Sequence, residues 1–544
     1  MNLLHRILAI ILLFFGLKTT AQTTFELSKF PKNNQLIPRD PSNNIGTYTI
    51  EGNVMRAANF SVLQAKVWKE NVLERTYVLN VPTDIEKFTF RIPIAIKAEL
   101  KNSKIELIAL KNNQEVSLAK AENIVSGDVF IINGQSNCIG RTEPVDYDKF
   151  LRSYSDQFGW NDIDYTSPSR WGPRMAKKII ENEKIPVAIF CEAVGGMRQT
   201  WYMRQAENPY TSGNYGILYD RLRKAEVEKN IRALFWWQGE SDGWETPLDS
   251  FKNQFKRLHS QWKEDYNAPV YYVQVRFRAC THVKPDVFEA QRQLASEIPD
   301  VEVLSNNPAL SLDGCHFAYT NGYDKIGEHA YNLLAAKLYN RSTANTRPPN
   351  IGEAFFSGTN EITLKMKNVI GNLRAIGNPW AEFKFEGCNA QIIGGSVSDY
   401  RIKLNYSGDT AGLTGISYLS HIDSFSQKWI VNPLGVGMLL FYNVPIHSRQ
   451  LTDVANTEGG NFEVYPNIVS NVLNVRFLKM DTTQKYIQIF NVNGQVVITK
   501  DIEDGAESIN LDVSDLPKGM YFVRLMLDNQ QLRQSIGTQK FICL

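Results

Sequence analysis

The feature that most constrains the fold is a regular alternation of short apolar segments with amphipathic ones between residues 124 and 340. The apolar segments are rich in β-branched and aromatic residues and comprise VFIIN at 129–133, VAIF at 187–190, ALFWW at 233–237 and VYYVQV at 270–275. Longer segments with helical spacing, such as SFKNQFKRLHSQWKED, lie between or after them. This alternation predicts βαβ units, in which helices cover a parallel sheet. We therefore expect an α/β domain over residues 123–343.

The regions on both sides of this domain change to short β-rich runs separated by turn residues. Examples are TYTIEGNV, RTYVLNV and KIELIAL before it, and EITLKMKN, AEFKFEG and GMLLFYNV after it. Such runs predict β-sandwich domains, which we expect at residues 22–122, 350–450 and 461–544. A proline-bearing segment at 346–350 and a polar segment at 452–460 are the expected linkers.

The N-terminus has the pattern of an export signal. A short basic start precedes an apolar run from Ile7 to Leu17, and small or polar residues then lead to Ala21. This pattern predicts a cleavable signal peptide at residues 1–21. The run is shorter than a membrane span requires, so we expect no transmembrane segment in the mature chain. The protein is expected to pass through the periplasm and to be secreted or held at the cell surface, where disulfides are permitted.

Composition excludes several classes of function. The formal net charge is only +2 over 544 residues, so no basic surplus points to nucleic acid. The six cysteines lie far apart and form no CxxC, which argues against a zinc knuckle or a thioredoxin-like motif. We expect neither a metal nor a cofactor.

Ser136 stands out because of its position in VFIINGQSNCIGR. It follows the end of a predicted buried strand, where open α/β sheets place their ligands. Gly134 permits a tight turn, but the segment is not a G-x-S-x-G elbow because Cys138 occupies the last position. Ser136 is therefore a candidate nucleophile, and an ordinary turn serine or helix cap is the alternative.

Asp313 and His316 form the second candidate group, in the segment SLDGCHF. A serine nucleophile needs a base within hydrogen-bond reach, and the base needs a partner that fixes its tautomer. Asp313 can orient His316 across so short a loop. Rival bases are His259, His282 and His329, of which the first and last lie on helical patterns that favour surface or packing roles.

Candidate donors to an oxyanion follow two other strands. An amide of Gly195 or Gly196 follows the strand VAIFCEA, and the side chain of Gln238 follows ALFWW. Preorganised donors of this kind stabilise the charge that develops in acyl transfer. Glu240 either orders its loop or contacts substrate. A plain turn is the alternative at both places.

In this order the motifs resemble the SGNH hydrolase superfamily, in its sialate O-acetylesterase branch of carbohydrate esterases. The shared motifs are G-Q-S-N at 134–137, a Gly-Gly pair followed by Trp201, W-Q-G-E at 237–240 and D-x-x-H at 313–316. The resemblance implies an SGNH-hydrolase-like central parallel sheet flanked by helices, with β domains before and after it. Met197 departs from the branch, which often has a small hydroxyl residue after Gly-Gly.

The resemblance also implies the chemistry and the site. It implies a secreted serine carbohydrate esterase, a carboxylic ester hydrolase of class EC 3.1.1, that removes O-acetyl groups from sugars through an acetyl-serine intermediate. It assigns catalysis to Ser136, His316 and Asp313 and the oxyanion hole to Ser136, Gly196 and Gln238. From their chemistry and positions, Arg198, Trp201 and Glu240 are the candidate substrate-binding residues. The alternative is a carbohydrate-binding or adhesin protein with a non-catalytic core, against which the complete serine, aspartate and histidine set argues.

The sequence leaves the identity of the acetylated sugar open. The carboxylate of a sialic acid would need a cation, and the candidates are Arg141, Arg198, Arg276 and Arg278. Acetylated xylan or another polysaccharide would need only aromatic platforms, such as Trp171, Trp201 and Trp236.

The last 84 residues, 461–544, resemble the C-terminal sorting domain of the bacterial type IX secretion system. The segments that carry this resemblance are VYPNIVSNVLNV, IQIFNVNGQVV and LDVSDLPKGMYFVRL. It implies export across the outer membrane by the type IX machinery. Ile468 replaces a usual proline, and the chain ends in QKFICL rather than in lysine. Another small β-sandwich binding module is the alternative.

A disulfide between Cys138 and Cys315 is also predicted. Cys138 stands two residues after Ser136, and Cys315 directly precedes His316. If Ser136 and His316 share a hydrogen bond, the two cysteines lie near each other, and an oxidising compartment favours a bridge. Cys191 is another possible partner, and buried free thiols are the alternative.

Overall fold

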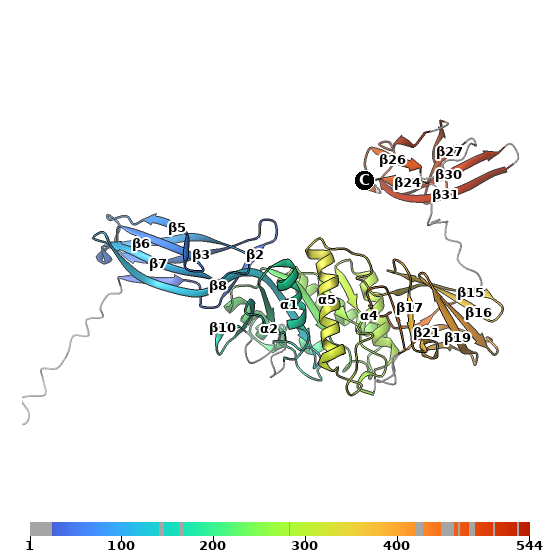
Figure 1. Cartoon of the computed structure of the whole chain (residues 1–544), viewed down its shortest axis with the longest axis horizontal. Helices are drawn as coiled ribbons and strands as arrows, with labels where there is room; N and C mark the ends of the chain where they lie inside the picture. The colour runs from blue at the N-terminus through green and yellow to red at the C-terminus, as the bar shows by residue number, and fades with distance from the viewer. Residues whose placement is uncertain are drawn as a thin grey trace, which may run out of the picture. The chain divides into compact units, whose positions relative to one another are not determined.

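The computed structural model describes residues 24–140, 146–162, 168–281, 283–419, 428–447, 462–465, 468–477, 485–503, 506–529 and 532–543. The predicted signal peptide, Arg141, His282 and the predicted linker at 452–460 lie outside these residues. The chain divides into two compact units, one formed by Met1–Ala354 with Thr359–Ile446 and the other by Phe355–Gly358 with His447–Leu544 (Figure 1).

A largely parallel sheet with helices forms the centre of the first unit, which confirms the α/β part of the prediction. Its strand order is β10-β9-β11-β8-β12-β13-β14, and only the β9–β10 pair is antiparallel. The strands are β8 (Gln114–Gly134), β9 (Leu151–Ser155), β10 (Gly159–Asp162), β11 (Val187–Phe190), β12 (Ile231–Trp237), β13 (Val270–Val273) and β14 (Val301–Leu304). The predicted apolar segments end β8, form β11, lie within β12 and include β13, and such runs are typical of strands covered on both faces.

Within the part of the chain that the structure describes, five α-helices accompany this sheet. They are α1 (Gly172–Glu183), α2 (Gly213–Lys224), α3 (Leu248–Asp265), α4 (Pro285–Glu297) and α5 (Asp324–Leu338). Helix α1 packs against α5, and α3 packs against α4. Each of these helices buries an apolar face, as amphipathic spacing predicts.

The N-terminal strands form antiparallel sheets that share one core. These strands are β1 (Phe25–Lys29), β2 (Leu36–Asp40), β3 (Ile45–Met55), β4 (Val62–Lys69), β5 (Val72–Asn80), β6 (Lys87–Lys97) and β7 (Ser103–Lys111). Strand β3 pairs with β6, and β4 pairs with β5 and β7. Alternate residues of both sheets, such as Ile50, Ile92 and Leu63, are buried in a single hydrophobic cluster.

Strand β8 joins this β region to the central sheet without a linker. It is 21 residues long and passes straight through the boundary expected between residues 122 and 123. Its first half pairs antiparallel with β7, and its last part pairs parallel with β11 and β12. One continuous strand therefore leads from the N-terminal sheets to the loop that carries Ser136.

The region after α5 is rich in strands, as predicted. It contains β15 (Asn350–Gly358), β16 (Glu361–Lys367), β17 (Arg374–Ile376), β18 (Phe383–Glu386), β19 (Gln391–Ser398), β20 (Arg401–Ser407), β21 (Gly415–Tyr418), β22 (Trp429–Val431) and β23 (Phe441–Val444). These strands form small sheets with the orders β15-β16-β20-β19, β17-β22 and β18-β21-β23.

The second unit contains two further small sheets around its own core. Their orders are β24-β26-β29 and β25-β31-β30-β27-β28. The strands are β24 (Phe462–Tyr465), β25 (Ile468–Val469), β26 (Val472–Phe477), β27 (Lys485–Asn491), β28 (Val496–Ile502), β29 (Ser508–Asp512), β30 (Gly519–Asn529) and β31 (Leu532–Cys543). The core includes the buried side chains of Leu473, Ile487, Val523 and Phe541.

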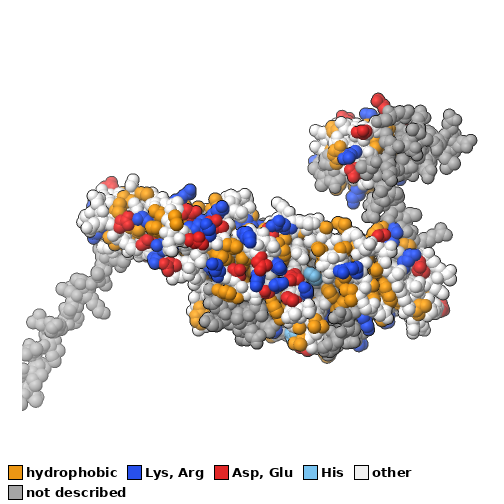
Figure 2. All heavy atoms as spheres, viewed as in Figure 1, with side chains coloured by type: hydrophobic (Ala, Val, Ile, Leu, Met, Phe, Trp, Pro, Cys, Tyr) orange, Lys and Arg blue, Asp and Glu red, His pale blue; other side chains and the backbone are white. Residues whose placement is uncertain are grey.

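Charges of both signs are interspersed over the face drawn in Figure 2, in keeping with the small net charge. Within the described ranges, no helix has both the length and the apolarity needed to cross a membrane.

Candidate active site

Ser136 lies in the loop that follows β8, at the carboxyl edge of the parallel sheet. Gly134 ends the strand with φ +138°, and a Cβ there would collide with the carbonyl oxygen of Trp237 at the end of β12. Only glycine therefore fits this close approach. The amide of Gln135 donates to the same carbonyl at 2.9 Å, and Nε of Arg170 donates to the carbonyl oxygen of Ser136 at 2.9 Å. Nothing in the sequence pattern had singled out Arg170.

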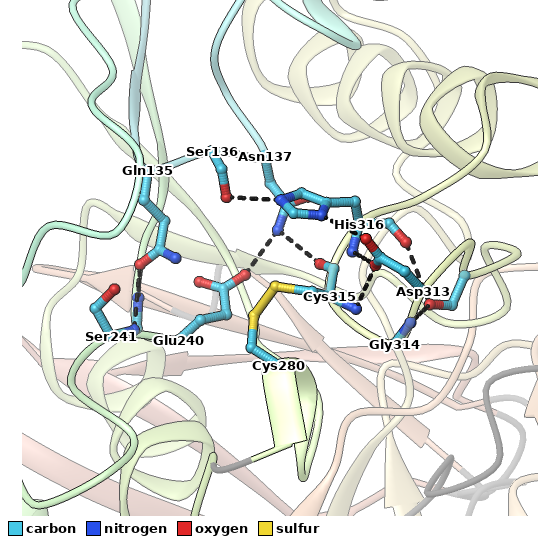
Figure 3. The surroundings of a disulfide bond; sticks show 12 residues. Gln135, Ser136, Asn137, Glu240, Ser241, Cys280, Asp313, Gly314, Cys315 and His316 are labelled. Atoms are coloured by element: carbon cyan, nitrogen blue, oxygen red, sulfur yellow. Dashed lines mark hydrogen bonds and ion pairs between the residues drawn. A yellow bond between two sulfur atoms is a disulfide. The ribbon is translucent and has the colours of Figure 1, made fainter.

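The structure brings Ser136, His316 and Asp313 together in one line of hydrogen bonds (Figure 3). Oγ of Ser136 lies 3.0 Å from Nε2 of His316, and Nδ1 of His316 lies 2.9 Å from Oδ2 of Asp313. Partial burial would raise the pKa of Asp313, but hydrogen bonds from the His316 ring and from the amides of His316 and Cys315 outweigh it and lower that pKa. An ionised Asp313 keeps the ring proton on Nδ1 and leaves Nε2 free to accept the Ser136 proton.

A short hairpin presents His316. Ser311 forms an antiparallel bridge with Phe317, and the amide of Leu312 donates to the carbonyl oxygen of His316 at 2.8 Å. Within the turn, Oδ1 of Asp313 accepts from the amides of Cys315 at 2.8 Å and His316 at 2.6 Å. These bonds close the turn. The Asp313 carboxylate therefore reaches the His316 ring although the two residues are only three positions apart.

Two of the three rival bases are engaged elsewhere, and the third, His282, lies outside the described residues. His259 lies on α3, its Nε2 is 3.1 Å from Oδ1 of Asp300, and burial is the main cause that lowers the pKa of His259. His329 is buried within α5, and burial lowers its pKa to about 4. His316 is thus the described histidine that contacts Ser136.

Asn137 is a site residue to which the sequence analysis gave no role. It is fully buried, and its Nδ2 donates to Oε1 of Glu240 at 2.8 Å and to the carbonyl oxygen of Cys315 at 3.2 Å. Its Oδ1 accepts from the hydroxyl of Tyr323 at 2.8 Å. The only signal for Asn137 was its place next to Ser136.

Glu240 has the contacts of a residue that orders its loop. It is only 2% exposed, and besides Asn137 its Oε1 accepts from Nε1 of Trp237 at 3.0 Å. Burial raises the pKa of its carboxyl group. Of the two roles expected for Glu240, these contacts support loop ordering and not substrate binding, because the side chain is withdrawn from the surface.

The structure contradicts the prediction that Gln238 donates to an oxyanion. Gln238 is fully buried, and its Nε2 donates to Oδ2 of Asp242 and to the carbonyl oxygen of Met197 at 3.2 Å. An amide nitrogen has two hydrogens, so both are used. Asp242 also accepts from the amide of Gln199 at 2.8 Å and therefore ties two loops together.

The Gly195-Gly196 loop passes beside Ser136. A Cβ built on Gly195 would lie 3.9 Å from Cβ of Ser136, whereas no atom lies within 4 Å of the equivalent position on Gly196, which has φ +71°. The hydroxyl of Tyr202 lies 2.6 Å from the carbonyl oxygen of Gly134 and fastens this loop to the end of β8. Of the two glycines, Gly195 is the neighbour of Ser136.

The candidate substrate contacts divide into exposed and buried groups. Trp201 is 54% exposed, and Arg198 is exposed and pairs with Glu245 at 3.3 Å. Trp171 and Trp236, in contrast, have no exposed surface and belong to the core, so they are not aromatic platforms. Arg276 is likewise buried and is not available to a sugar carboxylate, whereas Arg278 is exposed.

The predicted disulfide between Cys138 and Cys315 is wrong. Cys315 is bonded to Cys280, with Cα atoms 4.3 Å apart, and Cys138 and Cys191 are free (Figure 3). The Cys138 side chain turns into the core, where Sγ donates to the carbonyl oxygen of Asn133 at 3.3 Å. The loop after β13 lies against the hairpin instead, and the amide of Cys280 donates to the carbonyl oxygen of Gly314 at 3.0 Å.

Two segments of the chain match known families. Residues 160–335 match the family described as carbohydrate esterase, sialic acid-specific acetylesterase. This part of the chain is therefore similar to a carbohydrate esterase domain. Residues 463–539 match the secretion system C-terminal sorting domain, which implies secretion or display at the cell surface. The family match begins at residue 160, downstream of Ser136. The link between Ser136 and the matched segment is therefore the hydrogen bond to His316.

One solved structure shows that this fold recurs in another protein. A carbohydrate acetylesterase from Xanthomonas citri is 16% identical, with a TM-score of 0.54 over 77% of this chain and 99% of its own. That likeness is one of fold. A protein from Arabidopsis thaliana is 18% identical, with a TM-score of 0.33 over 39% of this chain and 99% of its own. No curated protein matches the sequence.

Proposed function

We propose that the protein is an exported serine esterase that removes O-acetyl groups from carbohydrates. The observation that carries this proposal is the line of hydrogen bonds from Oγ of Ser136 through His316 to Asp313. The position of Ser136 after β8, at the carboxyl edge of the parallel sheet, supports an SGNH-hydrolase type of fold. The description of the matching family supports a carbohydrate ester as substrate.

The proposed reaction has two halves. Nε2 of His316 takes the proton of Ser136, whose Oγ attacks the acetyl carbonyl, and the protonated ring then gives its proton to the leaving sugar oxygen. Water activated by His316 releases acetate from the acetyl-serine. Because Gln238 is committed to Asp242, we assign the oxyanion to the amides of Ser136 and of the Gly195-Gly196 pair.

Replacing the nucleophile and the base tests this mechanism. Ser136→Ala and His316→Ala are each expected to lower kcat by about 10⁴- to 10⁶-fold, and the double variant by little more, because such residues act as a unit. Acetate release from a chromogenic acetyl ester by the purified secreted protein measures this. Near-normal release by Ser136→Ala would reject the mechanism.

For the substrate we propose an O-acetylated sialic acid, on the strength of the family description. Arg198 is the exposed cation on the loop that passes Ser136, although Glu245 partly neutralises it. Arg198→Gln is expected to raise KM for O-acetylated sialic acid by about tenfold, because one charge-assisted hydrogen bond is lost. The KM for acetylxylan is expected to stay unchanged. Equal loss on both substrates, or faster release from acetylxylan by the unaltered protein, would assign a neutral polysaccharide instead.

We further propose that residues 461–544 direct export by the type IX machinery. The family match over 463–539 supports this assignment. A chain that lacks 461–544 is expected to remain active but to be retained in the periplasm. Arrival of the shortened chain in the medium would show that export does not depend on this segment.

A further inference from the structure

Arg276 is a buried cation that the proposed mechanism does not use. It is 5% exposed, and its Nη2 donates to the carbonyl oxygens of Asn306 at 2.7 Å and Ala309 at 2.5 Å. Within the described ranges no carboxylate pairs with it, and burial lowers its pKa to about 9, so it remains charged at neutral pH. Burying a charge is costly unless it is well bonded, so these carbonyl contacts fix the side chain in place.

Two aromatic rings complete the surroundings of Arg276. Its guanidinium lies 4.7 Å from the ring centre of Phe317 and 5.0 Å from that of Trp429, distances at which a cation is attracted to the ring face. Phe317 directly follows His316 in the hairpin. Trp429 begins β22 in the strand-rich region after α5. One side chain thus contacts both the hairpin of the base and the strand-rich region.

The same strand-rich region also holds the loop that leads into the hairpin. The amide of Gly437 donates to the carbonyl oxygen of Asn307 at 3.0 Å, and Nδ2 of Asn307 donates to the carbonyl oxygen of Met438 at 3.1 Å. A Cβ on Gly437 would collide with Asn307, so the two backbones are in close contact. Gln274 and Leu440 exchange two hydrogen bonds of 3.0 and 2.9 Å nearby.

We propose that Arg276 is a positioning residue for His316, and that the segment of residues 428–446, which carries Trp429 and Gly437, is a structural part of the active site and not a separable module. The inference rests on the proposed function. Arg276 holds the 306–309 loop at its carbonyls and the hairpin at Phe317, and Trp429 holds Arg276 from the other region. A displacement of about 1 Å at a catalytic group can cost about 100-fold in rate, so this support affects turnover.

Kinetic measurements on substituted proteins test the proposal. Arg276→Met keeps the volume but removes the donors, and Trp429→Leu removes one ring. Both are expected to lower kcat by about 10- to 100-fold and to change KM less than about twofold. Arg276→Lys keeps the charge over the rings and is expected to recover part of the loss. The control is Arg347→Met, which breaks an exposed ion pair with Glu302 (2.5 Å) and is expected to leave kcat unchanged.

Hydrogen exchange over residues 305–318 gives a second readout that does not depend on activity. The amides of Leu310, Leu312, His316 and Ala318 are hydrogen-bonded within this segment or to Asn321 and are expected to exchange faster in Arg276→Met and Trp429→Leu but not in Arg347→Met. Unchanged exchange and unchanged kcat in the two variants would overturn the positioning role. If the unaltered protein releases no acetate, the proposed function fails, while the exchange data still decide whether Arg276 fixes the hairpin.

Discussion

Nδ2 of Asn137 donates to the carbonyl oxygen of Cys315 at 3.2 Å, and this bond joins the loop of Ser136 to the hairpin of His316. Because Asn137 directly follows Ser136 and Cys315 directly precedes His316, the bond links the immediate chain neighbours of the two groups. Their relative position therefore does not depend only on the Ser136–His316 hydrogen bond.

Removing this link is expected to impair both activity and stability. Asn137→Ala removes one buried hydrogen-bond partner from Glu240, which keeps its bond from Trp237, and one from the Tyr323 hydroxyl, and losing such a partner costs about 1–3 kcal/mol. We expect a lower midpoint of urea unfolding and a lower kcat. Asn182→Ala, on the exposed end of α1, is the control and is expected to change neither quantity. Full activity in Asn137→Ala would show that the link does not position the two groups.

Gly134 is expected to tolerate no side chain. Gly134→Ala places a Cβ against the carbonyl oxygen of Trp237 and destabilises the junction of β8 and β12, with a cost of about 3 kcal/mol or more. Gly159→Ala, where φ is +70° and no atom lies within 4 Å, separates backbone strain from collision and is expected to cost about 1–2 kcal/mol. Thermal unfolding of both variants gives the comparison. Equal losses would mean that the collision is relieved by a small shift.

The sequence predicted those parts of the molecule that depend on local pattern. The alternation of apolar and amphipathic segments predicted the parallel strands, and the three-residue spacing of Asp313 and His316 predicted a turn that is indeed closed by its own hydrogen bonds. Ser136 was found because it follows a buried strand. In each case the deciding interaction lies within a few residues or along one strand.

The errors concern side chains whose surroundings come from distant segments. Gln238 was expected to face the site, but Asp242 and the Met197 carbonyl capture its amide. The residues of β12 on both sides of Trp236 are buried as well. The strand therefore shows no alternation of apolar and polar residues from which the orientation of Trp236 could have been predicted. The role of Arg276 depends on Trp429, which is more than 150 positions away, and no local pattern carries that information.

The interaction of Asp313 with His316 gives a pH dependence of stability with a defined sign. The pKa of the Asp313 carboxyl group is lowered in the folded state. The stabilisation that the ionised carboxylate provides is therefore present above the ordinary carboxylate pKa of about 3.9 and is lost as the pH falls through the lowered pKa. Asp313→Asn lacks this contribution. We expect the difference in unfolding free energy between the two proteins to shrink as the pH falls below about 4. A difference that does not change down to about pH 2 would contradict the assignment.

The Cys280–Cys315 bond is expected to hold the hairpin of His316 against the loop that follows β13. It closes a segment with a sequence separation of 35, which in the chain-entropy account corresponds to about 3–4 kcal/mol. A Cys280→Ala/Cys315→Ala variant is expected to unfold at a lower temperature and to show a lower kcat, because the residue before His316 loses its covalent anchor.

Alkylation of the denatured, unreduced protein is expected to modify Cys138, Cys191, Cys388 and Cys543 and to spare the bonded pair. The control is Cys388→Ala, which leaves the bonded pair in place and is expected to keep full turnover. If the double variant keeps full turnover while its stability falls, the disulfide stabilises the fold without positioning His316. Alkylation of Cys280 or Cys315 before reduction would contradict the disulfide itself.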